Sequence, residues 1–197
     1  EFDEPYLVKD LSAEDIALFT GLYQKILSQK GNVKVLLQTY FGDVRDCYQE
    51  IVSLDLDGIG LDFIEGKQTL QLVQQNGFPK DKLLFAGLVN GKNIWKNHYE
   101  KTTNLLQELT KYSSQIVLNT SCSLLHVPYT LRHETKLNEN YKKHFSFAEE
   151  KLNELAELAN IIDSASPEET PAYQKNKALF TEERFCENKG VQEKVAA

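Results

Sequence analysis

Side chains that could take part in chemistry recur where apolar runs of the chain end. They include one thiol, one carboxyl group and several amide and hydroxyl groups: Gln38, Tyr40, Asp62, Asn90, Ser121 and Cys122. Thiolates and carboxylates are metal ligands, and in β/α barrels the carboxyl ends of the strands carry the active site. We therefore expect any function of this chain to lie where these runs end. No Cys-x-x-Cys or Cys/His spacing predicts a closed zinc site.

The elements that must position these residues are four apolar runs, at 33–40, 58–63, 83–89 and 115–120. Each is almost continuously apolar, which is typical of a parallel strand buried on both faces. Segments of helical period lie between them, around 44–52, 70–76 and 105–112. The first helix is expected after Ser12, which begins a Ser-x-x-Asp capping sequence. Its apolar stripe is Ile16, Phe19, Tyr23, Ile26 and Leu27.

Strand and helix units that repeat about every 25 to 30 residues predict a parallel α/β fold, either doubly wound or a barrel. Units wound with one hand place their strands side by side in chain order. Residues 1–5 have the composition of the last residues of an earlier strand, and a closed barrel needs eight strands. We therefore expect a partial TIM-type β/α barrel, made of about its last four to five units.

A helical part is expected after the last strand. The side chains predicted on the buried side of one long helix are Phe145, Phe147, Ala148, Leu152, Leu155, Ala156, Leu158 and Ala159. Residues 163–173 are rich in Ser, Pro, Glu and Thr, which is typical of a linker or loop. Residues 174–197 are charged and contain few apolar residues, which predicts a marginal helix that needs a neighbour.

The composition argues against several classes of function. The chain has 197 residues, 41% hydrophobic and 26% charged, with a net charge of −7. A nucleic-acid partner requires a concentrated basic surface, and a membrane helix requires about 18 consecutive apolar residues; the sequence predicts neither. The first residues lack the basic region of a signal peptide. Three widely spaced cysteines are not a disulfide framework, and we expect a reduced cytoplasmic protein.

Four longer motifs give a more specific indication. Residues 3–5 read Asp-Glu-Pro, 87–95 read Gly-Leu-Val-Asn-Gly-Lys-Asn-Ile-Trp, 121–128 read Ser-Cys-Ser-Leu-Leu-His-Val-Pro and 145–152 read Phe-Ser-Phe-Ala-Glu-Glu-Lys-Leu. In this order and spacing they resemble the N-terminal half of cobalamin-independent methionine synthases, over about residues 1–162. The resemblance implies that residues 1–162 are the C-terminal half of the N-terminal β/α barrel. It implies that residues 163–197 are a linker and marginal helix leading to a catalytic domain.

The resemblance also implies where the chemistry of such an enzyme lies. In this family a second barrel holds zinc through a His, two Cys and a Glu at strand ends, and the metal ionises homocysteine for attack on the methyl group of a folate polyglutamate. In this chain Gln38 matches the His, Tyr40 the first Cys and Asp62 the Glu, and Cys122 alone keeps the ligand type. One thiolate and one short carboxylate cannot hold four-coordinate zinc. We therefore expect no catalytic, cofactor-binding or metal-binding residue here, and zinc only in the catalytic domain of the parent enzyme.

The strand-end residues are then expected to be vestigial or to line a rim between domains. The candidates are Asp3, Glu4, Gln38, Tyr40, Asp62, Asn90, Ser121, Cys122 and His126. We expect an ion pair or hydrogen bond for Asp3 and Glu4, a buried thiol for Cys122, a hydrogen bond to backbone for His126, and core or interdomain packing for Trp95. The alternatives are a vestigial ligand or reactive thiol at Cys122 and proton transfer at His126.

The leading hypothesis is a structural part of a methyltransferase that makes methionine from L-homocysteine and 5-methyltetrahydropteroyltri-L-glutamate. Its expected partners are the N-terminal strands of its own barrel, the catalytic barrel and, through the parent enzyme, folate polyglutamate and homocysteine. One alternative is a self-standing, barrel-derived module that binds a small anionic or thiol ligand, although four or five strands would leave unpaired edges. Another is a shorter methyltransferase with an unconventional site, against which stands the loss of His and Cys at Gln38 and Tyr40.

Overall fold

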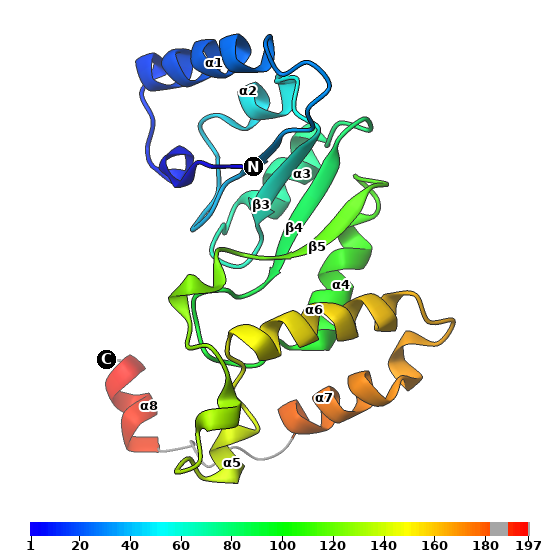
Figure 1. The fold of residues 1–197 in the computed structure, drawn as a ribbon. Helices are drawn as coiled ribbons and strands as arrows, with labels where there is room; N and C mark the ends of the chain where they lie inside the picture. Colours follow the sequence, from blue (N-terminus) through cyan, green and yellow to red (C-terminus); the bar gives the residue numbers. More distant parts are fainter. Residues whose placement is uncertain (182–188, 197) are drawn as a thin grey trace.

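The computed structural model describes residues 1–181 and 189–196, and its centre is one parallel sheet (Figure 1). The strands are β1 (Phe2–Asp3), β2 (Leu36–Gln38), β3 (Gly58–Asp62), β4 (Leu83–Val89) and β5 (Ile116–Thr120). They lie in the order β1-β2-β3-β4-β5, and each neighbouring pair is parallel. The predicted strand order, the parallel direction and the α/β class with a partial barrel are thus confirmed. β2 is shorter than predicted: Val33 is exposed and lies outside the ladder.

Helices alternate with the strands and then follow them. The first group is α1 (Ala13–Leu27), α2 (Tyr48–Ser53), α3 (Thr69–Asn76) and α4 (Tyr99–Leu109), and the second is α5 (Glu139–Lys142), α6 (Ala148–Ile162), α7 (Pro171–Thr181) and α8 (Lys189–Ala196). Short 3-10 helices are η1 (Pro5–Val8), η2 (Leu124–His126), η3 (Leu131–His133) and η4 (Pro167–Glu169). Among the described residues, none of the helices has both the length and the apolar content that a membrane span requires.

Local sequence signals explain where several helices begin and end. The Ser12 hydroxyl accepts a hydrogen bond from the Asp15 N–H while the Asp15 carboxylate accepts one from the Ser12 N–H, which is the capping box predicted for α1. Gly77 ends α3 with φ of 73°, a conformation that glycine adopts without a steric penalty. α2 begins at Tyr48, later than its apolar stripe predicts. Val44 and Cys47 are buried in the loop before it.

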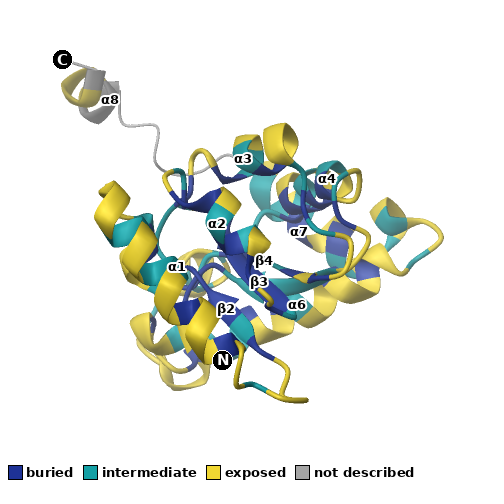
Figure 2. Ribbon diagram, turned by 90° about the horizontal axis from the view of Figure 1, so that it is seen from above, coloured by how far each residue is buried: buried dark blue, intermediate teal, exposed yellow. Residues whose placement is uncertain are grey.

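The two faces of the sheet differ in chemistry. On the face that packs against the helices, Leu37, Ile59, Leu61, Leu84 and Ala86 form the core together with residues of α1 to α4. Figure 2 shows this buried centre, with exposed residues on the outer sides of the surrounding helices. Because successive side chains of a strand point to opposite faces, the other face carries the alternate residues. In register, these are Gln38, Gly60, Phe85 and Val117, followed by Asp62, Gly87 and Asn119.

α6 and α7 form a second layer at the end of the sheet where β4 and β5 finish (Figure 1). Leu158 and Ile161 of α6 and Tyr173 of α7 enclose a smaller core with Val89 and Tyr99. The predicted linker at 163–173 thus ends inside α7, which packs against α4 and α6. Pro171 is the first residue of that helix, a position where the missing N–H of proline does no harm.

The predicted buried side of α6 is confirmed for Phe147, Leu155 and Leu158 and is wrong for three other residues. Leu152 is 56% exposed, and Ala156 and Ala159 are exposed as well. The helix also buries Lys151, Glu154 and Ile161, none of which was on the predicted buried side. Leu152 is apolar but points to solvent, so hydrophobicity alone does not identify the residues of α6 that face the protein interior.

Candidate functional site

The nine predicted rim residues all lie at or just beyond the carboxyl ends of the strands. At the first two strands, the Glu4 N–H donates to the carbonyl of Gln38 at 2.9 Å, and the Glu4 carboxylate accepts from the Tyr23 hydroxyl at 2.7 Å. The expected hydrogen-bond role of Glu4 is therefore confirmed. The Gln38 side-chain amide lies over Gly60 of β3. A Cβ atom added to Gly60 would lie 1.5 Å from Gln38 Oε1. Glycine at 60 gives this buried amide its space.

Asp62 is a buried carboxyl group with one satisfied oxygen. Its Oδ1 accepts from the N–H groups of Ile64 at 2.7 Å and Glu65 at 3.0 Å, while Oδ2 has no hydrogen-bond partner among the described residues. Burial raises the pKa of Asp62, and the hydrogen bonds from backbone N–H groups act in the opposite direction. The aspartate thus shapes the loop that follows β3.

Tyr40 lies between the ends of β1 and β2. Its hydroxyl is 3.5 Å from Glu1 Oε1, and burial together with the charges of Asp3 and Glu1 raises the pKa of the phenol above its usual value. No hydrogen bond or ion pair of the Asp3 side chain is found among the described residues, so the expected bond of Asp3 is not seen. A phenol with a raised pKa keeps its proton near neutral pH and is a poor metal ligand.

The ends of β4 and β5 are joined by a close backbone approach. The Ser121 N–H donates to the carbonyl of Val89 at 2.8 Å, and the Gly91 N–H donates to the Ser121 hydroxyl at 3.2 Å. A Cβ atom on Gly91 would lie 2.3 Å from the Cys122 carbonyl oxygen, so only glycine fits. The Asn90 side chain accepts from the N–H groups that follow it in the chain, at 92 and 93, and this closes the turn.

Cys122 and His126 lie near each other in the chain but differ in exposure. Cys122 is buried, as expected, and burial raises the pKa of its thiol. His126 is exposed, and its ring meets Phe41 edge-on with centroids 5.3 Å apart; within residues 1–181 and 189–196 the predicted hydrogen bond of His126 to backbone is not found. Phe41 has φ of 72°, an uncommon conformation for a non-glycine residue. Sequence reasoning missed Phe41, since no local signal predicts a left-handed phenylalanine.

An ion pair that the sequence did not predict lies at the same end of the sheet. Lys92 Nζ is 2.7 Å from Glu65 Oε2, which links the loop after β4 to the loop after β3. The charge of Lys92 also acts on Asp62 and Cys122. The structure therefore gathers Tyr40, Asp62 and Cys122 with this pair at one end of the sheet.

The donors at the zinc-matching positions do not suit zinc. Gln38 offers a neutral amide and Tyr40 a protonated phenol, while one oxygen of Asp62 is engaged by two backbone amides. In residues 1–181 and 189–196, no three His, Cys, Asp or Glu side chains are close enough to hold a metal ion. We therefore derive no chemistry through a metal at this place.

Two of the long motifs, 87–95 and 145–152, meet in space. Ser146 N–H donates to the carbonyl of Ile94 at 2.7 Å, Lys96 N–H donates to that of His144 at 2.9 Å, and Trp95 and Phe145 form an antiparallel bridge. We call these two segments, 94–96 and 144–146, the clasp. Trp95 is 54% exposed and its ring centroid is 5.1 Å from that of Phe145, so the core position considered for Trp95 is wrong.

Side chains from α6 and α7 hold the segment between the clasp and α4. Lys151 Nζ donates to the Trp95 carbonyl at 3.1 Å, and Glu154 Oε1 accepts from the Asn97 N–H at 3.1 Å. Asn176 of α7 donates to the Asn97 carbonyl at 2.9 Å and accepts from the Tyr99 N–H at 3.0 Å. Burial lowers the pKa of Lys151 and raises that of Glu154. These polar groups orient the loop after β4.

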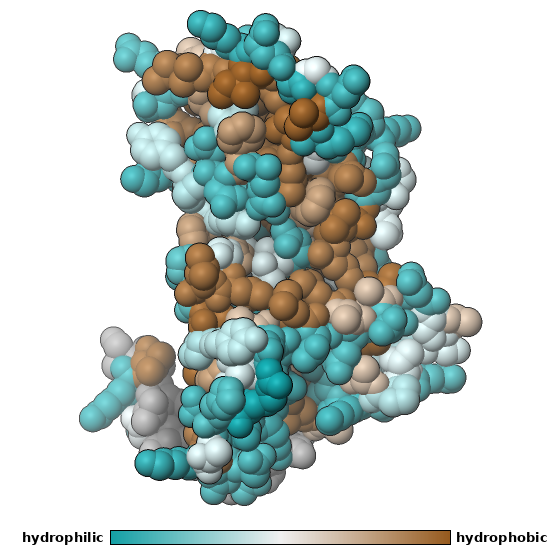
Figure 3. All heavy atoms as spheres, in the orientation of Figure 1, coloured by the Kyte–Doolittle hydropathy of each residue, from teal (hydrophilic) through white to brown (hydrophobic). Residues whose placement is uncertain are grey.

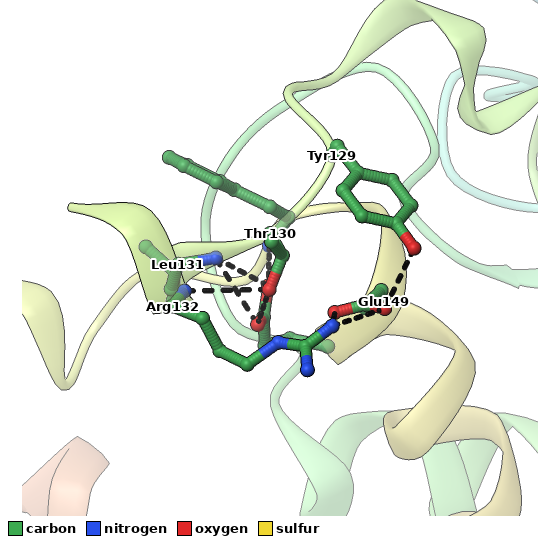
Figure 4. Close-up of polar contacts among 7 residues, drawn as sticks. Tyr129, Thr130, Leu131, Arg132 and Glu149 are labelled. Atoms are coloured by element: carbon green, nitrogen blue, oxygen red, sulfur yellow. Dashed lines mark hydrogen bonds and ion pairs between the residues drawn. The ribbon is translucent and has the colours of Figure 1, made fainter.

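The third long motif, 121–128, leads into a segment fastened to the start of α6 (Figure 4). Arg132 contacts both oxygens of the Glu149 carboxylate, at 2.8 and 2.7 Å, and the Tyr129 hydroxyl donates to the same carboxylate at 2.9 Å. Next to Glu149, Glu150 accepts from the Thr130 hydroxyl at 3.0 Å. The motifs 87–95, 121–128 and 145–152 therefore converge on the ends of β4 and β5 and the start of α6.

Large apolar side chains remain exposed around this convergence. Leu125 of η2 is 92% exposed and Tyr129 is 67% exposed. We call the exposed side chains of Trp95, Leu125 and Tyr129 the rim surface; none of them is among the nine predicted rim residues. Figure 3 shows hydrophobic atoms gathered where β5 runs into η2, and a second group over α1 at the top of the molecule. In α1 these are Leu18, Leu22 and Ile26, which recur every fourth residue on the outer side of the helix.

Comparisons with known proteins agree with these motifs. Residues 1–114 match the family described as cobalamin-independent synthase, N-terminal domain. Proteins named 5-methyltetrahydropteroyltriglutamate–homocysteine methyltransferase are 58% identical over 180 residues in Campylobacter jejuni strain RM1221 and 53% identical over 195 residues in Lactococcus lactis subsp. lactis strain IL1403. These matches cover 91% and 99% of this chain but 24% and 25% of the relatives. The chain spans about a quarter of the length of these curated relatives.

A solved structure is similar in fold. It is a B12-independent methionine synthase from Shewanella sp. W3-18-1 in complex with selenomethionine, with a TM-score of 0.51 over 82% of this chain and 47% of that chain. The sequence identity is 16%, so this likeness concerns the fold alone. The family match, in contrast, includes 114 of the 197 residues, β1 to β4 among them. On that match, the chain belongs to the family of cobalamin-independent synthases, in the part that forms their N-terminal domain.

Proposed function

We propose that this chain is the structural part of an enzyme that transfers a methyl group from 5-methyltetrahydropteroyltriglutamate to homocysteine and so makes methionine. The observation that supports this proposal is the 52–58% identity, over nearly the whole chain, to relatives with that activity in their names. The chain itself contributes packing and support for folate binding, and the reaction takes place in another domain of the same polypeptide.

The chemistry of the strand ends supports a non-catalytic role. Asp62 is turned toward backbone amides, and its pKa is raised by burial. The thiol of Cys122 is buried, and its pKa is raised as well. A buried, protonated thiol is a weak nucleophile and a weak ligand. Zinc and homocysteine therefore belong to the catalytic domain of the parent enzyme in this proposal.

The exposed apolar side chains fit the partners of such a part. The rim surface lies at the carboxyl ends of the strands, and we propose that the catalytic barrel packs there. The outer stripe of α1 (Leu18, Leu22 and Ile26) would meet the neighbouring helix of the first half of the same barrel. Each of these side chains contributes roughly 1.5–3 kcal/mol when fully buried, which favours a covered arrangement over exposure to solvent.

The domain division is part of the same proposal. Residues 1–162 form the C-terminal half of the N-terminal barrel, and residues 163–197 form the passage to the catalytic domain. α7 belongs to that passage in sequence, although it packs on α4 and α6. A cytoplasmic location, expected from the widely spaced cysteines, stays a prediction.

The test is a methyl-transfer assay of the complete enzyme with 5-methyltetrahydropteroyltriglutamate and homocysteine. Cys122→Ser and Asp62→Asn should leave the turnover number within about twofold and the zinc content unchanged, because neither residue binds metal or substrate. Leu125→Asp in the rim surface should lower kcat/KM by about tenfold or more, as the loss of a buried interface anchor does. Val33→Asp, also exposed but at the opposite end of the sheet, is the matched control.

Two results would contradict this proposal. One is methyl transfer by the isolated 197-residue chain; the other is the loss of bound zinc from the complete enzyme on Cys122→Ser. The alternative of a self-standing binding module predicts that the isolated chain binds homocysteine or a small anion through the rim residues. Calorimetry with homocysteine on the isolated chain and on its Cys122→Ser and Asp62→Asn variants separates the two.

A further inference from the structure

A cavity lies among the helices that follow the sheet, next to the clasp. Its volume is about 440 Å³, and it opens between α5, α7, the C-terminal half of α6 and the start of α4. Figure 1 shows α5 and α7 below the sheet, flanking this region. None of the nine rim residues lines the cavity. Cavities of about 300–1,000 Å³ are the size that holds small-molecule ligands.

The charge of the lining is opposite to that of the chain. Four lysines line the cavity, Lys96, Lys142, Lys143 and Lys175, against two glutamates, Glu139 and Glu157. The lining therefore carries a formal charge of +2, whereas the whole chain carries −7. Several cations around one concave surface raise the local potential and the local concentration of anions.

Both glutamates of the lining are already engaged, while two of its lysines form no ion pair among the described residues. The Glu157 carboxylate accepts a hydrogen bond from the Tyr99 hydroxyl. Glu139 Oε1 lies 3.4 Å from Lys142 Nζ, and the Glu139 side chain is 83% exposed. Neither Lys96 nor Lys175 has an ion pair within 4 Å in the part of the chain that the structure describes. These lysines come from separate elements, the clasp and α7, so they approach a ligand from different sides.

The remaining walls are apolar or fixed. Leu131, Phe145 and Leu179 supply apolar surface, and both the oxygen and the nitrogen of the Asn176 side-chain amide are used in hydrogen bonds to backbone. A ligand that fits must therefore combine an apolar body with negative charge. We propose that this cavity binds a small organic dianion, a phosphate monoester or dicarboxylate with a compact apolar skeleton. The proposal does not depend on the function proposed above.

Phenyl phosphate is a suitable probe, because at about pH 8 it carries two negative charges on an aromatic ring. Isothermal titration of the intact protein at low salt should give a dissociation constant below about 1 mM. Inorganic phosphate, which lacks the apolar body, and phenol, which lacks the charge, should each bind at least about tenfold more weakly. Raising the ionic strength to about 0.3 M should weaken phenyl phosphate binding, because it screens the lysines.

Substitutions on one helix provide matched variants. Lys175→Met should weaken phenyl phosphate binding by about tenfold, the usual effect of losing a contact to a charged group, and Lys96→Met combined with it should weaken binding further. Lys177→Met is the control, since Lys177 is also on α7 but pairs with Glu100 and does not line the cavity. Ala178→Phe narrows the cavity without changing its charge and should abolish the binding of phenyl phosphate.

Several outcomes would overturn the proposal. Phenyl phosphate that fails to bind at about 10 mM excludes a site of this kind. Binding that survives the double substitution of Lys96 and Lys175, or that Ala178→Phe leaves unchanged, places the ligand elsewhere. An equal loss in Lys177→Met shows only general attraction to surface lysines. Circular dichroism confirms that each variant is folded, and Lys175, Lys177 and Ala178 lie at the surface or half-buried, where substitution is well tolerated.

Discussion

Replacing Lys151 with methionine tests whether this buried lysine fastens the segment after β4 to α6. The Lys151 side chain is fully buried, and its Nζ donates to the Trp95 carbonyl at 3.1 Å. Methionine fills a similar volume, so Lys151→Met removes the polar contact with little change in packing. The lost hydrogen bond should lower the free energy of unfolding by about 1–3 kcal/mol. Lys151→Ala removes three further methylene groups, and the total loss should reach about 3–5 kcal/mol.

The measurement is urea unfolding at about pH 7, followed by circular dichroism and by the fluorescence of Trp95, the single tryptophan of the chain. Lys101→Met is the control: Lys101 is an exposed lysine on α4, and its replacement should change stability by less than about 0.5 kcal/mol. The reasoning is refuted if Lys151→Met is as stable as the wild type or more stable. That result would mean that the cost of burying the amino group exceeds the value of its hydrogen bond.

The same variant has a predicted pH dependence. Burial lowers the pKa of Lys151 from its ordinary value of 10.5. Between the lowered pKa and 10.5 the unfolded chain is protonated at this group while the folded chain is neutral, so the unfolded state binds more protons. Stability from this group therefore rises with pH across that window. The difference in unfolding free energy between wild type and Lys151→Met should grow as the pH approaches 10.5, and a constant difference would contradict the lowered pKa.

Two further predictions concern backbone space and charge. Gly91→Ala should destabilise the protein by more than about 2 kcal/mol, because its Cβ would lie 2.3 Å from the Cys122 carbonyl oxygen, whereas Gly21→Ala in α1, with open space around it, should stabilise by about 0.5–1 kcal/mol. Thermal unfolding compares them, and equal effects would contradict the close approach. The hydrogen bond from Lys34 is the main reason that the pKa of Asp57 lies well below its ordinary value of 3.8. The ionised Asp57 carboxylate therefore stabilises the folded state fully above pH 3.8, and this stabilisation is lost as the pH falls toward the lowered pKa. The difference between wild type and Asp57→Asn should therefore shrink from pH 4 toward pH 2, and a constant difference in acid titration would speak against it.

The sheet was predictable because its signals are local. An almost continuously apolar run such as 83–89 predicts a strand that is buried on both faces of a parallel sheet. β4 (Leu83–Val89) has those bounds in the structure. Ser12 and Gly77 likewise mark helix boundaries through their own side-chain or backbone chemistry. The common location of the strand-end residues was predictable for the same reason, since parallel strands bring their carboxyl ends to one edge of the sheet.

The contacts of the site were not predictable, because they depend on packing between distant elements. Lys151 and Glu154 are typical of a solvated helix face in sequence, and they are buried only because α6 turns them toward the loop after β4. Asn176 lies in a charged tail whose sequence has no strong helical stripe, yet its side chain donates to the Asn97 carbonyl. The left-handed backbone of Phe41 has no local sequence signal either.

The bonds made by α6 and α7 also order events during synthesis. The Thr39 hydroxyl and the Gly60 carbonyl that join β2 and β3 are 21 residues apart, so the first strands can pair soon after they emerge from the ribosome. The hydrogen-bond partner of the Asn97 N–H, Glu154, is synthesised 57 residues later. The partner of the Asn97 carbonyl, Asn176, is synthesised 79 residues later. Until then, water must hydrate the peptide groups that lead into α4. The native hydrogen bonds of this loop therefore cannot be complete before α6 and α7 have been synthesised.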